Sequence, residues 1–273
     1  MKKDNNMNNP KISVVTVVYN DVDHIESTIK SVISQTYPHI EYIVIDGGST
    51  DGTVDIIKKY KNSIAYFISE KDNGIYDAMN KAINAANGEW ISFINSWDSF
   101  YSNDVIEKIF SNRFKNGVDV IYGDVCLITV DGNLIKTFGK LKPDMVPFNL
   151  CHQSTFTKTR LLKKYKYDTS YRIAADMDFF NKINKNENSI FEYIPIIIAN
   201  YECGHGTSAN NLWKKYSEYR RLKDVKLSSI SGIKHYIKDI IKYLYYSLPF
   251  GLSDYLVKKR MKKLYKPNNG QKA

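Results

Sequence analysis

The sequence predicts an α/β protein whose central sheet is mostly parallel. Two observations predict this class: β-branched apolar runs recur as strands, and segments with helical spacing alternate with them four times within about a hundred residues. Short connections in such a series force right-handed crossovers, which lay the strands parallel. The chain has 273 residues and is 43% hydrophobic, so it can bury a full core.

Four apolar segments predict the strands of the N-terminal part. Residues 12–19 (ISVVTVVY) form a near-continuous β-branched run, which is typical of a strand covered on both faces. Further strands are predicted over residues 42–46, 65–68 and 90–94. Apolar residues at helical spacing predict the three intervening helices: Ile25, Ile29, Val32 and Ile33; Val54, Ile57 and Tyr60; Ile75, Met79, Ala82, Ile83 and Ala86.

The pattern changes after residue 100. Residues 118–122 predict a strand, and residues 125–130 and 134–138 predict a hairpin around Asp131-Gly132. A helix is expected to start near Ala175, and a further strand is expected over residues 191–199.

Polar and acidic side chains gather at the carboxyl ends of the first four strands. These ends lie at residues 19–20, 46–48, 69–72 and 95–98. Ligands of parallel α/β sheets bind beyond such ends. Loop carboxylates would repel phosphates unless a cation lay between them, and they can also accept hydrogen bonds from a base or a ribose. The loops therefore predict a site for a nucleoside diphosphate with a metal.

Several classes of protein are disfavoured. The chain has no G-x-x-x-x-G-K-[ST] motif and no G-x-G-x-x-G after the first strand, which argues against P-loop NTPases and nicotinamide dehydrogenases. Its three cysteines are far apart, as is typical of a reducing compartment. With no signal peptide and no apolar run of about 20 residues, a cytoplasmic location is expected, with a peripheral position on the inner face of a membrane left open.

Six strings resemble, in order, the signatures of family-2 glycosyltransferases, and together they cover roughly residues 11–208. They are SVVTVVYN (residues 13–20), IDGGSTDGT (45–53), SEKDNGIYDAMNK (69–81), GEWISFINSWDSF (88–100), His152-Gln153 and ADMDF (175–179).

The resemblance implies a Rossmann-like type A glycosyltransferase fold and inversion at the anomeric carbon. It also implies roles for particular residues. Tyr19 and Asp46 would hold the nucleoside base, Asp72 belongs to a matched nucleotide-sugar-binding string, and Asp77 would lie at the donor. Asp98 falls in the metal-binding segment, for Mg²⁺ or Mn²⁺, and Asp176 matches the catalytic base.

One position departs from the family pattern. The metal segment commonly has a carboxylate immediately before its last Asp, where this chain has Trp97, which cannot ligate a metal. Asn95 could add only a neutral oxygen. His205, in a glycine-bearing segment, is a further candidate to approach the metal or the diphosphate.

Each candidate also has a purely structural interpretation. Asp46 could be a loop or cap residue, Tyr19 could belong to the core, and Asp77 could lie on a solvated helix face. Of Asp176 and Asp178, one could be the base and the other a helix cap, with Asp176 preferred.

Basic charge is concentrated in the C-terminal segment. From Lys214 onward there are 16 Lys and Arg against 4 Asp and Glu, so this segment carries +12 while the whole chain carries +10. Apolar residues from Ile230 to Leu248 recur three and four apart, and a second basic segment extends to Lys266. The preferred hypothesis is that residues 230–266 lie on an anionic membrane surface. A helix packed on the catalytic domain is the alternative, and no nucleic-acid motif is present.

Together these features predict three regions: a disordered N-terminus (1–10), a catalytic domain (11–212) and a basic helical extension (213–273). The catalytic domain would divide into a nucleotide-binding half (11–100) and an acceptor and base half (101–212).

The expected function is metal-assisted, inverting transfer of a monosaccharide from a nucleoside-diphosphate sugar, with a UDP-sugar as one candidate, to a hydroxyl of a glycan or lipid-linked glycan. The setting would be bacterial surface polysaccharide assembly. The alternatives are a catalytically silent glycosyltransferase-like subunit and a sugar nucleotidyltransferase.

Overall fold

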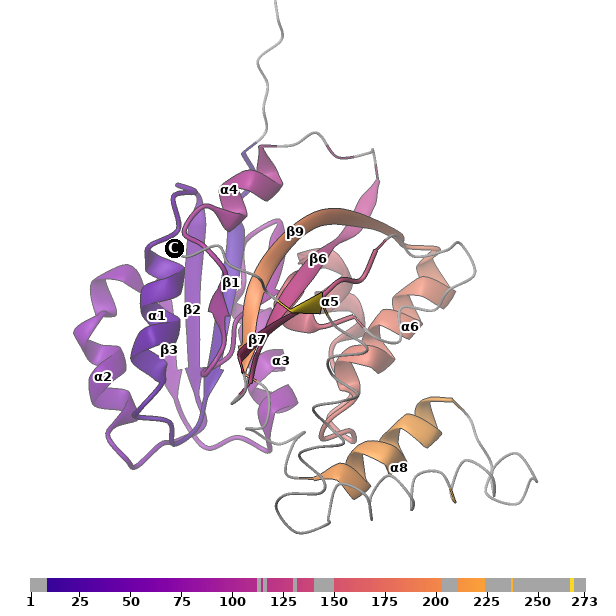
Figure 1. Ribbon diagram of the computed structural model, residues 1–273. Helices are drawn as coiled ribbons and strands as arrows, with labels where there is room; N and C mark the ends of the chain where they lie inside the picture. The colour runs from indigo at the N-terminus through magenta and orange to yellow at the C-terminus, as the bar shows by residue number, and fades with distance from the viewer. Residues whose placement is uncertain are drawn as a thin grey trace, which may run out of the picture.

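The computed structural model is an α/β protein (Figure 1). It describes residues 9–111, 114, 117–129, 132–139, 150–202, 211–223, 237 and 266–267. The expected disordered N-terminus lies almost wholly outside these residues, as do His205 and most of residues 230–266.

The N-terminal part of the sheet is parallel, as predicted. Strand β1 (Ile12–Val18) pairs with β2 (Ile40–Asp46) on one side and β4 (Trp90–Phe93) on the other, and β2 pairs with β3 (Tyr66–Ser69). Every residue of β1 is buried, because helices cover both faces of the sheet there. This explains the near-continuous apolar run of β1. The outermost strand, β3, is partly exposed.

The second part of the sheet is mixed. Beyond β4 the order continues through β8 (Thr155–Lys158), β6 (Val118–Thr129) and β7 (Gly132–Lys136), and all of these contacts are antiparallel. A long strand, β9 (Ile190–Glu202), pairs parallel with β6 and antiparallel with the short β5 (Ser99–Phe100). At the far edge, β10 (Lys266–Pro267) pairs with β7.

Helices form a layer on each face of the sheet, and each layer has its own apolar cluster. On one face, β1 and β2 pack with α1 (Ile25–Ile33), α2 (Thr53–Lys59) and α4 (Val105–Phe110). The other face is covered by α3 (Ile75–Ala85), α5 (Thr159–Tyr165) and α6 (Ala175–Glu187). A short helix η1 (Lys61–Ser63) precedes β3, another, η2 (His152–Ser154), precedes β8, and α8 (Leu212–Leu222) lies below α6 in Figure 1.

Several predicted elements differ from those observed. Residues 118–122 and 125–130 were expected to be separate strands, but β6 runs through both, with register shifts against β9 near Tyr122 and Asp124. The hairpin of β6 and β7 is confirmed by its pairing, although its turn lies outside the described residues. Helices α4 and α5 and strands β5 and β8 were not predicted, because they are short and are stabilised mainly by the surrounding core.

Among the described residues, no helix is long and apolar enough to cross a bilayer.

Candidate active site

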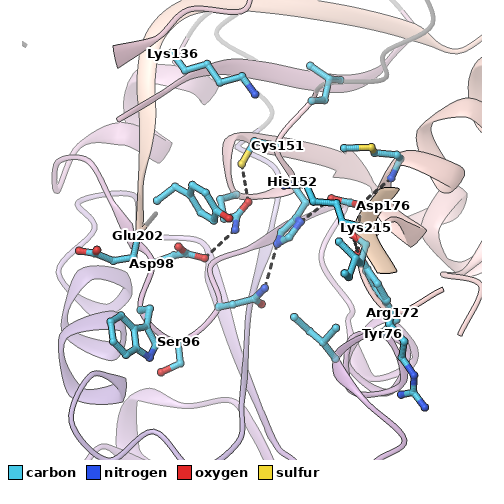
Figure 2. Close-up of a pocket in the computed structure, with 18 of the residues that line it drawn as sticks. Tyr76, Ser96, Asp98, Lys136, Cys151, His152, Arg172, Asp176, Glu202 and Lys215 are labelled. Atoms are coloured by element: carbon cyan, nitrogen blue, oxygen red, sulfur yellow. Dashed lines mark hydrogen bonds and ion pairs between the residues drawn. The ribbon is translucent and has the colours of Figure 1, made fainter. Parts of the chain in front are cut away.

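A cavity of about 340 Å³ opens beyond the carboxyl end of β4, between the two parts of the sheet (Figure 2). The loop after β4 contributes Asn95, Ser96, Trp97 and Asp98 to its lining. Other parts of the wall come from η2, the start of α6, the end of β9, and α8. The cavity therefore collects residues from both halves of the chain.

Asp98 is a buried carboxylate in this wall, with only 5% of its surface exposed. Burial raises its pKa to about 7, because an ion loses its hydration there, and the charge of Glu202 acts in the same direction. A hydrogen bond from Gln153 Nε2 to Asp98 Oδ2, at 3.0 Å, opposes that rise. Asp98 is thus poised to be ionised when a cation approaches.

Trp97 takes the left-handed backbone conformation at φ 81°. Its ring stacks on His24 with 3.4 Å between ring centroids. His24 Nδ1 lies 2.6 Å from Asp21 Oδ1, and Asp21 also accepts a hydrogen bond from Ser96. The side chain that replaces the expected carboxylate is therefore held against the start of α1.

The oxygen atoms around Asp98 fit a hard divalent cation. Asn95 Oδ1 is buried and has no hydrogen-bond partner among the described residues, a costly state that a cation would relieve. Carboxylate and amide oxygens suit Mg²⁺ or Mn²⁺. Within the described residues, no group of three or more His, Cys, Asp and Glu side chains could hold a metal. Such an ion would then take its remaining ligands from phosphates and water.

Asp176 lies in the first turn of α6, is 7% exposed and lines the same cavity. His152 Nδ1 is 2.9 Å from its Oδ2 (Figure 2). Asn95 Nδ2, which can only donate, lies 3.1 Å from His152 Nε2. This contact assigns the imidazole proton to Nδ1, so His152 donates to Asp176.

Tyr76 completes the surroundings of Asp176. Its hydroxyl lies 2.8 Å from the carbonyl oxygen of Ile173 and 3.3 Å from Asp176 Oδ1. Burial raises the pKa of Tyr76 well above its usual value, and the charge of Asp176 adds to the effect. The base candidate therefore sits in a largely buried, hydrogen-bonded environment.

The short helix η2 connects the two buried carboxylates. His152 contacts Asp176, and the next residue, Gln153, donates to Asp98. Cys151 Sγ donates to Gln153 Oε1 at 2.7 Å, which fixes the orientation of the Gln153 amide. Burial raises the pKa of the Cys151 thiol to about 12, so it remains a neutral donor.

A second group of predicted residues lies at the ends of β1, β2 and β3. Tyr19 is 63% exposed, so the alternative that it belongs to the core is wrong. A Cβ added at Gly47 would lie 2.5 Å from Asp72 Oδ2 and 3.3 Å from the Tyr19 ring. Tyr19 and Asp72 thus both lie close to Gly47, at the sheet edge where nucleosides bind in this class of fold.

Asp46 is fully buried and organises this loop from within. Its carboxylate accepts hydrogen bonds from the backbone N–H groups of Gly48 and Ser49, and from the hydroxyls of Ser49 and Ser69. Through these contacts Asp46 shapes the segment that lies beside Tyr19.

Asp77 and Asp178 have structural partners. Asp77 Oδ2 accepts from the backbone N–H of Asn73 at 3.0 Å and lies 3.8 Å from Lys81. Asp178 Oδ2 pairs with Lys182 at 2.6 Å. Neither residue lines the cavity that holds Asp98 and Asp176.

Several residues of the cavity had no role predicted from the sequence, and His152, Gln153 and Glu202 are the ones that contact or face the two carboxylates. His152 and Gln153 lay in a matched string without an assigned role, and Glu202 follows a strand whose end was predicted at residue 199. The matched string His152-Gln153 was the available sequence signal for two of them. Only the packing of η2 against the loop after β4 shows what these two residues contact. His205 lies outside the described residues.

Two buried carboxylates from different halves of the chain face one cavity, and the comparisons with known proteins identify the class of enzyme. Residues 13–187 match Glycosyl transferase family 2. The chain therefore belongs to glycosyl transferase family 2 and is a glycosyltransferase, which confirms the resemblance seen in its sequence strings.

One relative is the PGL/p-HBAD biosynthesis glycosyltransferase of Mycobacterium bovis. It is 28% identical over 233 residues, and the match covers 82% of this chain and 88% of the relative.

Two solved structures are similar in fold. S. aureus TarS 1-349 in complex with UDP-GlcNAc has a TM-score of 0.64 at 17% identity, with 93% of this chain and 83% of that chain covered. The match spans 50% of a longer S. aureus TarS chain. Mannosyltransferase PcManGT from Pyrobaculum calidifontis, in complex with GDP-Man and Mn²⁺, has a TM-score of 0.61 at 15% identity, with 94% and 81% covered. These likenesses support the type A glycosyltransferase architecture expected from the sequence.

Proposed function

We propose that this glycosyltransferase moves a monosaccharide from a nucleoside-diphosphate sugar to an acceptor hydroxyl, with inversion at the anomeric carbon. The observation that carries the proposal is that Asp176 and Asp98 are both buried, line one cavity and are linked through η2. One carboxylate is placed to take a proton, and the other to serve the leaving diphosphate.

In the proposed reaction, the oxygen of the acceptor hydroxyl attacks the anomeric carbon. Asp176 accepts the proton of that hydroxyl as the new bond forms. The bond from that carbon to the diphosphate oxygen breaks, and the nucleoside diphosphate leaves with the bonding electrons. A single in-line displacement inverts the anomeric carbon. Holding both substrates in line supplies much of the rate enhancement.

Asp98 and Asn95 would hold a divalent cation, and Mg²⁺ or Mn²⁺ bound there would offset the charge developing on the leaving diphosphate. The Asn95 Oδ1 beside the Asp98 carboxylate, unpartnered within the described part of the chain, supports this, together with the Mn²⁺ bound to the structurally similar mannosyltransferase.

For the donor, we propose that Tyr19 and Asp72 contact the nucleoside, and that Asp46 supports them by shaping the loop at Gly48 and Ser49. Asp77, at the start of α3, would lie near the donor and would position the loop before α3 by accepting a hydrogen bond from the backbone N–H of Asn73. A UDP-sugar is the first candidate donor, supported by the UDP-GlcNAc bound to the S. aureus relative.

The proposed setting is assembly of bacterial surface glycans on the cytoplasmic side of the membrane, with a glycan or lipid-linked glycan as acceptor. The relative in PGL/p-HBAD biosynthesis supports a glycolipid setting. The basic extension supports a peripheral membrane position.

The test is a panel of UDP-glucose, UDP-N-acetylglucosamine and GDP-mannose, scored for binding and hydrolysis with and without Mg²⁺ or Mn²⁺. We expect Asp98→Ala and Asp176→Ala to abolish transfer, with Asp176→Ala still binding nucleotide, because the base acts on the acceptor. Asp178→Ala is the matched control, since it removes the neighbouring carboxylate on the same helix and should retain activity.

Each rival has its own signature in this panel. Transfer by Asp176→Ala at the parent rate would refute the base assignment. If the parent protein binds no nucleotide, the catalytically silent subunit is favoured instead. Release of pyrophosphate from a nucleoside triphosphate and a sugar phosphate would identify a sugar nucleotidyltransferase.

A further inference from the structure

Helix α8 lies beyond the residues that match the family, yet it borders the candidate active site. The family match ends at residue 187, whereas α8 spans Leu212–Leu222. Lys215 and Tyr219 line the cavity together with Asp176. Tyr219 is close enough to Asp176 for that charge to raise its pKa, although burial is the larger cause. The helix thus forms part of the wall next to the proposed base.

Glu218 of α8 is a carboxylate with 4% of its surface exposed. Its oxygens accept hydrogen bonds from three successive backbone N–H groups, those of Arg172 at 2.8 Å, Ile173 at 2.9 Å and Ala174 at 3.1 Å. Lys214 Nζ, 3.9 Å away, is its ion-pair partner. A buried carboxylate bound in this way holds a backbone segment strongly, since hydrogen bonds to charged groups are stronger than neutral ones.

The segment that Glu218 holds leads directly into the base. Ala174 is the N-cap residue of α6, and Asp176 lies in the first turn of that helix. The carbonyl oxygen of Ile173 accepts a hydrogen bond from the hydroxyl of Tyr76, and this hydroxyl also lies 3.3 Å from Asp176 Oδ1. The position of residues 172–174 therefore sets where α6 begins and where Tyr76 meets Asp176.

A second contact fixes α8 against the same stretch of chain. The Arg221 guanidinium lies 4.1 Å from the centre of the Tyr171 ring, and its Nη2 donates to Ser170 Oγ at 2.9 Å. Glu218 and Arg221 are three residues apart on one face of the helix, and they contact residues 170–174 at two points.

We propose that Glu218 is a positioning residue for the glycosyl transfer: it fixes residues 172–174 and, through them, the orientation of Asp176. This inference rests on the proposed role of Asp176 as the base. It makes α8 part of the catalytic architecture, although neither the family match nor the sequence strings include it. Glu218 touches neither donor nor acceptor in this scheme, so its effect should be on turnover and not on nucleotide binding.

The experiment compares Glu218→Gln with Glu41→Gln in the full chain. Gln keeps the size of Glu but loses the charge and offers one fewer acceptor oxygen to the three N–H donors. Glu41 is a matched control, because it is equally buried and accepts from the Asn87 backbone N–H and Ser13 Oγ at 2.7 and 2.6 Å, but at the opposite end of β2 from the site. Asp176→Ala provides the reference for loss of the base.

Two readouts are used. Hydrogen exchange measures the amides of residues 172–174 in the protein alone, and steady-state kinetics use whichever of UDP-glucose, UDP-N-acetylglucosamine and GDP-mannose is turned over. For Glu218→Gln we expect faster exchange at residues 172–174, a kcat lower by about tenfold or more, and a donor KM within about twofold of the parent value. Glu41→Gln should lower the melting temperature and leave kcat and exchange at residues 172–174 unchanged.

The outcomes separate this inference from the proposed function. An inactive Asp176→Ala combined with a Glu218→Gln variant at the parent kcat would overturn the positioning role and leave the base assignment standing. A Glu218→Gln variant that loses only stability, with normal kcat per folded molecule, would likewise reduce Glu218 to a structural contact. Full activity of Asp176→Ala would overturn the base role of Asp176, and with it the positioning role of Glu218 that rests on that base. Should Glu218→Gln fold poorly, Arg221→Gln tests the second point of contact with residues 170–174, with the same expected loss of kcat.

Discussion

At the scale of single residues, Asp98 combines burial with the proposed role of a metal ligand, which requires a charged carboxylate. The desolvation that raises its pKa to about 7 also keeps its carboxylate out of contact with bulk water. Its neighbour Trp97 is held on His24 with a left-handed backbone, an arrangement that costs conformational energy in a residue with a bulky side chain. Backbone strain at Trp97 and the raised pKa of Asp98 occur at adjacent positions, and both features are typical of functional sites.

The raised pKa of Asp98 predicts a pH-dependent stability in the absence of divalent ions. The folded state binds the Asp98 proton more tightly than the unfolded state, where the pKa is near 3.8. This contribution is fully present below about pH 4 and is lost as the pH rises through 7. Asp98→Asn removes it, so the free energy of unfolding of the variant should gain on that of the parent between pH 4 and pH 8. The gain is about 1.4 kcal/mol for each tenfold difference in proton affinity.

Chemical denaturation in EDTA at several pH values measures this difference. Asp55→Asn is the control for loss of one negative charge, because the Asp55 side chain on α2 is 80% exposed. A difference between Asp98→Asn and the parent that stays constant from pH 4 to pH 8 would contradict the prediction.

At the scale of elements, η2 connects parts of the site that are far apart in sequence. A single turn of helix places His152 on Asp176 and Gln153 on Asp98, while Asn95 contacts the other nitrogen of His152. The turn is anchored because it leads into β8, which is inserted between β4 and β6. The two candidate carboxylates are therefore both contacted by one short helix.

His152→Ala is expected to lower kcat and leave nucleotide affinity unchanged. Without the N–H donated by His152, the Asp176 carboxylate loses a partner that fixes its orientation. A loss of about 10- to 100-fold is the range found when residues that orient a functional ligand group are removed. His39→Ala, at an exposed histidine remote from the cavity, is the control. Unchanged kcat in His152→Ala, or a change confined to donor KM, would count against this role.

The sequence predicted some elements well and others poorly, for a physical reason. Strand β1 and helix α3 are long and periodic, so their own side chains determine their type. The two residues of β5 and the six of α4 carry too little local signal, since they are stabilised by packing against β9 and α1. Strand β6 continues through residues that were predicted to interrupt it, because its long partner β9 accompanies it along most of its length.

At the scale of the whole molecule, basic charge is concentrated toward the C-terminal end of the sequence. The excess of basic residues begins at Lys214, in the first turns of α8, and continues through the C-terminal segment. The start of this extension packs on the preceding part of the chain through Glu218 and Arg221 of α8. Most of residues 230–266 lie outside the described residues, and the membrane hypothesis for them stays a prediction.

Flotation with vesicles tests that hypothesis. We expect the full chain to bind vesicles containing anionic lipid, and a chain ending at Ser229 to bind much less, because each basic residue near such a surface contributes about 1 kcal/mol. Vesicles of neutral lipid are the control for electrostatic attraction. The truncated chain retains α8, so its fold can be checked by nucleotide binding. Equal binding of both chains to anionic vesicles would rule out a membrane role for residues 230–266.

The sequence by itself determined the parallel half of the sheet, the family, and the candidates Asp98 and Asp176. These follow from local patterns: buried strands are apolar, and the loops after them carry the polar residues. Only the tertiary structure decided that Tyr19 is exposed and that Asp46 shapes its loop from within. It also decided that His152 contacts Asp176, that Gln153 contacts Asp98, and that Glu218 holds the backbone that leads into α6. The contacts of His152 with Asp176, Gln153 with Asp98 and Glu218 with Ile173 join residues 24 to 55 positions apart. Core packing closes such distances, and no local pattern records them.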